Sequence, residues 1–176
     1  MSPLKRTKIE YGTFSSANGI PYAKSGTGAK TMLIALGRPG NHISKGLSLK
    51  MYSSAYKEYL DQYTQYYITR KSNLTEGYSV EQMADDYKEL IDSEFRGMVD
   101  VFIGISYGGM ILTHFASKYA KSAKEIIILM AAHKGSPEGM KLDLEHARLM
   151  AQKKQGKAFA KFAPILTQNK LLLPFL

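Results

Sequence analysis

The chain has 176 residues, of which 44% are hydrophobic, and this length is enough for one domain with a substantial core. It contains no cysteine, which excludes disulfides, thiolate metal sites and a cysteine nucleophile. The N-terminus lacks an apolar segment of signal-peptide length, and no apolar run approaches the roughly 18 residues of a membrane span. We therefore predict a cytoplasmic protein with no membrane span.

The net charge of +9 is concentrated towards the C-terminus, where residues 131–176 hold 8 Lys and Arg against 3 Asp and Glu. A basic tail is typical of proteins that bind nucleic acid or anionic membranes. Here, however, the cations alternate with apolar residues as on the solvated face of an amphipathic helix, and most are lysines rather than phosphate-binding arginines. We predict no nucleic-acid partner. Binding of the lysine-rich tail to an anionic surface stays a weaker hypothesis, beside the two main ones given at the end of this section.

In chain order, the first half of the sequence predicts strands that alternate with helices. Two short strands around the turn Asn18-Gly19 indicate a hairpin over residues 8–24. Apolar and β-branched runs predict strands at 31–36 and 63–69, with a helix at 46–60 between them. Ser79 then suits the N-cap of an amphipathic helix that follows it.

The second half continues this alternation, with strands predicted at 99–103 and 125–131 around a helix at 109–119. Strands that are apolar throughout are typical of a sheet covered on both faces. We therefore predict an α/β domain with a mostly parallel sheet, flanking helices and an N-terminal antiparallel hairpin. This core spans 1–135. Residues 136–176 start a helical lid or cap, with a helical pattern over 139–162 that equally suits an ordinary surface helix.

Residues 104–109 read G-I-S-Y-G-G and place Ser106 on a corner between a strand and a helix. Such a corner needs strained backbone angles at the serine, and small residues at Gly104, Gly108 and Gly109 let the strand and helix approach. The corner raises the hydroxyl above the carboxyl edge of the sheet, where the backbone N–H of Tyr107 can stabilise an oxyanion. We predict that Ser106 is a nucleophile; the alternatives are a chance pattern in a loop and a glycine-rich phosphate cradle.

On this motif and on the order of its elements, the chain resembles the α/β-hydrolase superfamily over essentially its whole length. In that family, the loop after the third strand commonly reads His-Gly-x-x-Gly and supplies a second oxyanion N–H. Residues 36–40 read L-G-R-P-G, so the resemblance implies the backbone N–H of Arg38, next to Gly37, with leucine in place of the histidine. Serine at position 106 argues against the haloalkane dehalogenase and epoxide hydrolase branches, whose nucleophile is a carboxylate.

The same resemblance implies that the C-terminal part of the fold is missing. In the family, the triad acid and histidine follow the nucleophile on loops after later strands, and here no counterpart of the seventh and eighth strands is expected. Within the chain, His133 is the one candidate base or pocket residue, because it follows a strand at the carboxyl edge, and Glu138 or Asp143 is its candidate orienting group. The other histidines are expected in loop, packing or solvated positions: His42, His114 and His146.

These features predict a serine hydrolase, similar to carboxylesterases, that acts on a small ester or acyl substrate without a metal or cofactor. Full activity is expected only of a longer chain that carries the acid and histidine. The alternative is a non-catalytic module of the same fold that binds a ligand or a partner. The terminal segment L-L-L-P-F-L is a candidate contact for a homo-oligomer, because it would be a sticky patch if exposed.

Overall fold

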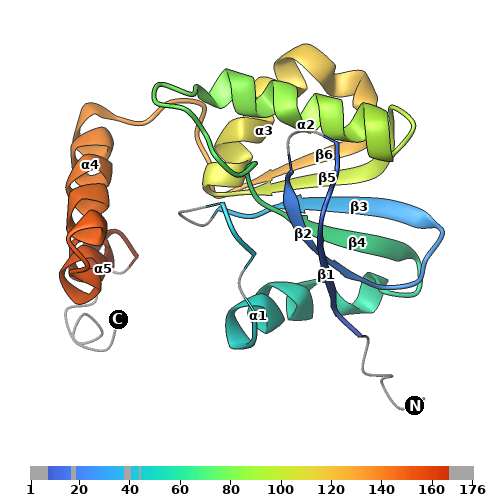
Figure 1. The fold of residues 1–176 in the computed structure, drawn as a ribbon, viewed down its shortest axis with the longest axis horizontal. Coiled ribbons are helices and arrows are strands. Elements are labelled where there is room, and N and C mark those ends of the chain that lie inside the picture. The colour runs from blue at the N-terminus through green and yellow to red at the C-terminus, as the bar shows by residue number, and fades with distance from the viewer. Residues whose placement is uncertain (1–7, 17–18, 38–40, 44, 167–176) are drawn as a thin grey trace. The chain divides into compact units, whose positions relative to one another are not determined.

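The computed structural model describes residues 8–16, 19–37, 41–43 and 45–166, and the chain divides into two compact units, Met1–His133 and Lys134–Leu176. The first unit contains a six-stranded sheet (Figure 1). Its strands are β1 (Glu10–Thr13), β2 (Pro21–Ser25), β3 (Lys30–Ala35), β4 (Tyr63–Ile68), β5 (Val99–Ile105) and β6 (Ala123–Leu129).

The strands lie in the order β1-β2-β4-β3-β5-β6. The hairpin β1–β2 is antiparallel and joins the rest of the sheet through an antiparallel β2–β4 pair, whereas β4, β3, β5 and β6 run parallel to one another. This arrangement confirms the predicted α/β class, the mostly parallel sheet and the N-terminal hairpin. It also brings the carboxyl ends of four parallel strands to one edge, where the loops that follow them meet.

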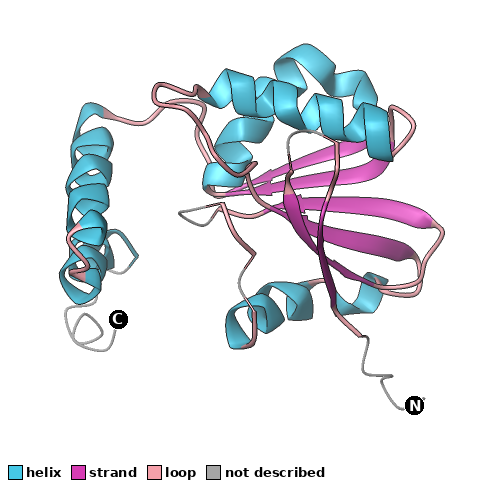
Figure 2. Cartoon of the chain, viewed as in Figure 1, coloured by secondary structure: helices cyan, strands magenta, loops and turns pink. Residues whose placement is uncertain are grey.

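Helices cover both faces of this sheet (Figure 2). Helix α1 (Leu47–Ala55), followed by a short 3₁₀ turn at Lys57–Tyr59, lies on one face, and helices α2 (Val80–Glu94) and α3 (Tyr107–Tyr119) lie on the other. The apolar strands contribute side chains to a hydrophobic core on each face of the sheet. In β5, Phe102 belongs to the core under α2 and α3, whereas Val101 and Ile103 belong to the core under α1. Burial on both faces explains why these strands are apolar without alternation.

The second unit is a pair of helices, α4 (Pro137–Ala151) and α5 (Gln155–Leu166). The helical pattern predicted over 139–162 is thus interrupted. Lys153 adopts a positive φ of 57°, its N–H donates to the carbonyl of Met150, and the N–H of Lys154 donates to the carbonyl of Leu149. These two bonds form a Schellman motif, which ends a helix and here uses lysine instead of glycine. Among the described residues, no helix is long and apolar enough to cross a membrane.

One carboxylate ties three strands of the sheet together at its amino edge. Asp100 accepts a hydrogen bond from Lys124 Nζ at 2.7 Å and one from the backbone N–H of Thr31 at 2.8 Å. The Lys124 ammonium, followed by the Thr31 amide, holds the pKa of Asp100 below its usual value. Because the pKa of Asp100 is lower in the folded protein than in the unfolded chain, its ionised carboxylate stabilises the fold at pH values above the ordinary carboxyl pKa. This contribution is lost as the pH falls through the lowered pKa of the folded state.

We expect Asp100→Asn to lower the free energy of unfolding at pH 7 by about 1 kcal/mol, because a charge-assisted bond between β5 and β3 is weakened. The variant should also lose less stability than the parent on acidification. Urea denaturation at pH 7 and at a pH below the ordinary carboxyl pKa measures both effects, with the exposed Asp61→Asn as the control. The same acid dependence in Asp100→Asn and the parent would contradict the assignment.

Candidate active site

Ser106 occupies the corner between β5 and α3 with backbone angles of φ 54° and ψ −117°. Its N–H donates to the carbonyl of Leu129 at 2.9 Å, and its own carbonyl accepts the first helical bond from the N–H of Met110 at 3.0 Å. The residue is exposed. A serine rarely adopts such angles, which cost on the order of 1–3 kcal/mol, and they persist only where the surrounding contacts impose them.

Two other serines stand at helix starts and show what is different here. Ser79 and Ser136 have extended backbones, and the side chain of each accepts a hydrogen bond from a backbone N–H of its own helix, α2 and α4 respectively. The side chain of Ser106 makes no such capping bond to α3. The hydroxyl of Ser106 therefore does not cap the helix, which is the usual role of a serine at a helix start.

Four glycines allow backbone segments to approach one another closely at this corner. A Cβ at Gly104 would lie 2.8 Å from the Cα of Gly109, and a Cβ at Gly108 would lie 2.2 Å from the carbonyl oxygen of Ala35. Similarly, a Cβ at Gly109 would lie 2.6 Å from the Cβ of Ala131. These separations are shorter than real Cβ contacts. A side chain at Gly104, Gly108 or Gly109 would therefore push α3 away from β5, from the end of β3 or from the residues after β6, respectively.

The fourth glycine, Gly37, allows the end of β3 to lie close to Ser106. A Cβ there would lie 2.5 Å from the Cβ of Ser106 and 3.1 Å from the backbone nitrogen of Tyr107. The predicted second oxyanion donor, Arg38, lies outside the described residues. Tyr107 is the first residue of the 13-residue helix α3, and N–H groups at a helix start have no intrahelical partner.

The aromatic ring of Tyr107 is held by two neighbours that the sequence analysis did not single out. Its hydroxyl donates to Met83 Sδ at 3.7 Å, and the guanidinium carbon of Arg70 lies 4.7 Å from the ring centroid. Arg70 lies two residues after the end of β4 and is only 9% exposed. The sequence carried one signal for this residue, an arginine placed right after a buried strand, but its stacking on Tyr107 depends on the order of strands in the sheet.

A compact polar cluster supports the neighbouring loop. Lys71 Nζ donates to Tyr78 Oη at 2.6 Å and to Asp86 Oδ1 at 3.0 Å, and Tyr78 Oη donates to the same carboxylate oxygen at 2.9 Å. Burial alone would lower the pKa of Lys71, but its bonds to Tyr78 and Asp86 outweigh burial and raise that pKa. Asn41 Nδ2 also donates to the carbonyl of Lys71 at 3.3 Å, which links the loops that follow β3 and β4.

The histidines occupy four different settings. His133 is exposed and follows β6, at the same carboxyl edge as Ser106. On α3, His114 Nδ1 lies 3.5 Å from Glu81 Oε1 of α2. His42 is an exposed loop residue, and His146 lies on α4 in the second unit. The role of His133 as a base, with Glu138 or Asp143 as its orienting group, stays a prediction.

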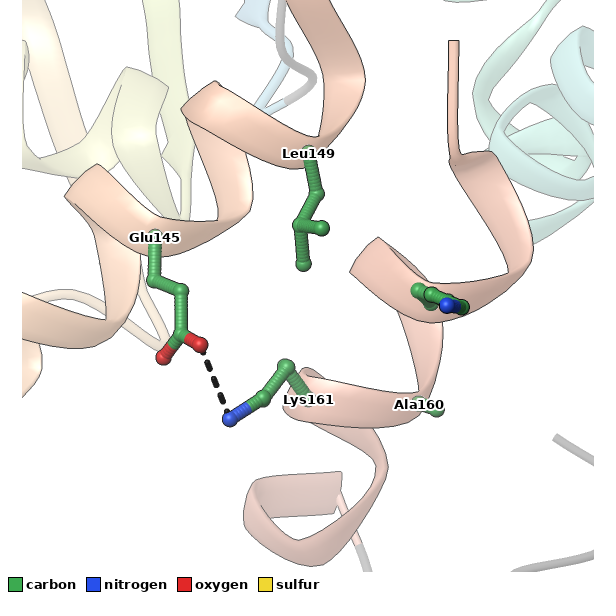
Figure 3. A pocket seen from close by; sticks show the side chains of 5 residues that line it. Glu145, Leu149, Ala160 and Lys161 are labelled. Atoms are coloured by element: carbon green, nitrogen blue, oxygen red, sulfur yellow. Dashed lines mark ion pairs between the residues drawn. The ribbon is translucent and has the colours of Figure 1, made fainter. Parts of the chain in front are cut away.

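A groove of about 420 Å³ lies in the second unit, and it contains none of the predicted site residues (Figure 3). Its polar wall includes an ion pair between Lys161 Nζ and Glu145 Oε1 at 2.9 Å. The groove is lined by one leucine, one alanine and three charged residues: Glu145, Leu149, Lys157, Ala160 and Lys161. The groove is open to solvent and has no serine among its lining residues, so we do not assign a catalytic role to it.

Comparison with known proteins finds likeness in structure. No protein-family model matches the chain, and no curated protein matches its sequence. Cfl2 from Burkholderia cenocepacia matches with a TM-score of 0.59 at 15% identity, covering 96% of this chain and 61% of that one. An α/β-fold family hydrolase from Bacillus anthracis matches with a TM-score of 0.51 at 16% identity, covering 72% and 44% of the two chains. Epoxide hydrolase VrEH1 from Vigna radiata matches with a TM-score of 0.53 at 17% identity, covering 67% and 39%.

The chain therefore has the α/β-hydrolase fold, as the resemblance in its sequence implied. The six-stranded, mostly parallel sheet with flanking helices corresponds to part of that fold. The chain spans 61% of the length of Cfl2 and less of the other two structures.

The backbone strain at Ser106 leads to a prediction about stability. We expect Ser106→Gly to raise the free energy of unfolding by about 1–3 kcal/mol, because glycine adopts positive φ without the steric cost that serine bears. Urea denaturation at neutral pH measures the change.

The matched control for this prediction is Ser79→Gly, which removes a side-chain cap from an unstrained serine and should cost a few tenths of a kcal/mol. If Ser106→Gly were as stable as the parent or less stable, the corner would not be strained as described.

Proposed function

We propose that this chain carries the nucleophile of a serine hydrolase that acts on a small ester or related acyl compound. The observation that carries the proposal is the state of Ser106: an exposed serine in a strained backbone conformation whose side chain does not cap the helix behind it. Residues with strained backbone angles occur mostly at functional sites. In open α/β sheets, ligands bind at the carboxyl edge of the parallel strands. Epoxide hydrolases share the fold, but we favour acyl chemistry because the nucleophile position holds a serine rather than a carboxylate.

In the proposed reaction, Ser106 Oγ attacks the carbonyl carbon of the substrate while a base takes the hydroxyl proton. The electron pair of the carbonyl moves onto its oxygen, which accepts hydrogen bonds from the N–H of Tyr107 and, we propose, from that of Arg38. The carbonyl then re-forms and the alcohol leaves with a proton, which produces an acyl-enzyme that water hydrolyses by the same steps.

The amino-acid sequence supports four further parts of the proposed function: the cofactor requirement, the division into domains, the location of the protein and the identity of the base. The chemistry needs no metal or cofactor, because the side chains and backbone N–H groups supply the nucleophile and the oxyanion contacts. We assign residues 1–135 to the core and residues 136–176 to the start of a lid or cap, and we propose that the protein is cytoplasmic. The base is His133 or a group outside residues 1–176.

We expect a fluorophosphonate to label the 176-residue chain at Ser106, because an activated serine attacks phosphorus as it attacks a carbonyl carbon. Intact-mass analysis should show one adduct per chain, and the adduct should be absent from Ser106→Ala. Ser136→Ala is the matched control and should label like the parent. No adduct in a folded parent chain would contradict a nucleophile activated within these residues. It would leave two explanations, a base outside residues 1–176 and the non-catalytic ligand- or partner-binding alternative.

If His133 is the base, His133→Ala should slow labelling at pH 8 by about a hundredfold, since a positioned general base contributes on the order of 10²–10⁴ in rate. His146→Ala is the control and should label at the parent rate. A rate unchanged in His133→Ala would exclude His133 and place the base elsewhere.

A further inference from the structure

Tyr107 joins the proposed oxyanion contact to a partly buried aromatic ring. Its backbone N–H is the proposed donor, and its side chain leaves the same Cα at the first position of α3. The ring packs against the hydrophobic core under α2 and α3. A ring that is held in place fixes the side-chain rotamer and restricts rotation of the first helical turn. The contacts of this ring therefore also restrict the direction of the N–H.

Two side chains from other elements contact the ring of Tyr107. The guanidinium carbon of Arg70, in the loop after β4, lies 4.7 Å from the ring centroid. From α2, Met83 Sδ accepts a hydrogen bond from the hydroxyl of Tyr107 at 3.7 Å. Arg70 and Met83 are both buried, so water is largely excluded from these contacts. The end of β4, α2 and the start of α3 thus meet at one aromatic ring.

The contact with Arg70 is the stronger of the two. A thioether sulfur is a weak hydrogen-bond acceptor. A guanidinium within about 6 Å of a ring centroid is attracted to the ring face, and this attraction is greater when the cation is removed from water. Burial of a charge is costly, and an apolar side chain such as methionine would fill the same space without that cost. A role in orienting the ring explains why an arginine occupies this position.

The backbone at Arg70 is itself anchored. The preceding residue, Thr69, is fully buried, and its carbonyl accepts a hydrogen bond from Tyr87 Oη of α2 at 3.3 Å. The following residue, Lys71, forms an ion pair with Asp86 of α2 at 3.0 Å. Both chain neighbours of Arg70 are therefore tied to the same helix, which gives the guanidinium a fixed starting point.

We propose that Arg70 is a positioning residue of the active site: its guanidinium holds the ring of Tyr107 so that the N–H of Tyr107 points at the oxyanion. This inference rests on the proposed function, because it takes Tyr107 as an oxyanion donor. Such donors lower the reaction barrier when they are aimed in advance at the oxygen on which charge develops. In this role Arg70 contacts neither the substrate nor the reacting atoms and acts through Tyr107.

Nuclear magnetic resonance tests this role without requiring catalysis. Arg70→Met keeps a long side chain and removes the charge. We expect the order parameter of the Tyr107 N–H to fall from about 0.85, typical of a rigid backbone, towards about 0.6. Arg70→Lys keeps the charge without the planar guanidinium and should give an intermediate value. An order parameter that is the same in Arg70→Met and in the parent would overturn the proposal.

The matched control is Lys88→Met. Lys88 Nζ lies 5.9 Å from the ring centroid of Tyr119, so this variant also removes a cation from a ring of α3, but at the opposite end of the helix. It should leave the order parameter of the Tyr107 N–H unchanged. A fall in Lys88→Met as large as that in Arg70→Met would overturn the proposal, because the effect would then be a general loosening of α3.

The kinetics of fluorophosphonate labelling test the effect on the reaction. In Arg70→Met we expect the rate constant of the covalent step to fall about tenfold, less than the roughly 10²–10³ loss on removing an oxyanion donor. The reagent concentration for half-maximal rate should not change, because charge develops on the phosphoryl oxygen only during attack. In Tyr107→Leu, which lacks the ring, Arg70→Met should cause no further loss. An equal loss in both backgrounds would overturn the proposal.

These measurements separate a failure of this proposal from a failure of the proposed function. A folded parent chain that does not label contradicts a nucleophile activated within these residues, and the order parameter of Tyr107 then decides the role of Arg70. A parent chain that labels no faster than Arg70→Met contradicts the role of Arg70 and leaves the nucleophile in place. Melting curves show whether each variant folds, and Arg70→Lys carries both comparisons if Arg70→Met does not.

Discussion

The organisation of this molecule depends on the close approach of three backbone segments at Ser106. The end of β5, the start of α3 and the end of β3 come so near to one another that a Cβ at Gly104, Gly108 or Gly37 would collide with its neighbours. Their packing imposes the positive φ of Ser106, and that angle turns the serine away from the capping role. A locally unfavourable conformation is thus maintained by tertiary contacts, because a strained backbone persists only where its surroundings impose it.

Several side-chain interactions surround the corner and connect the loops next to it. Arg70 stacks on the ring of Tyr107, the residue whose N–H is the proposed oxyanion donor. The cluster of Lys71, Tyr78 and Asp86 anchors the next loop to α2, and Asn41 links that loop to the one after β3. Because charged groups in a largely buried setting interact more strongly than in water, these contacts can hold the carboxyl edge in one geometry.

Local patterns in the sequence predicted most of the elements and the corner itself. Their ends were less predictable: β5 extends to Ile105 rather than Ile103, and α3 begins at Tyr107 rather than Gly109. Glycine is a poor strand and helix former, so propensity predicted too early an end for β5 and too late a start for α3. In the structure, β5 continues because Gly104 pairs with Ile128, and Ile105 with Leu129, in β6. The shift of β6 from the predicted 125–131 to Ala123–Leu129 reflects the positive φ of Met130, which ends the strand.

The class of the fold, the position of Ser106 and the need for small residues around it were predictable from the amino-acid sequence, because these depend on neighbours within a few positions along the chain. The position of β4 between β2 and β3, the contact of Arg70 with Tyr107, and the exposure of the apolar run of β6, the outermost of the described parallel strands, were not predictable in this way. These features depend on contacts between residues that are distant in the chain. The order of the strands determines which of these distant residues meet. That order depends on how the whole sheet is buried, and a local sequence pattern does not specify it.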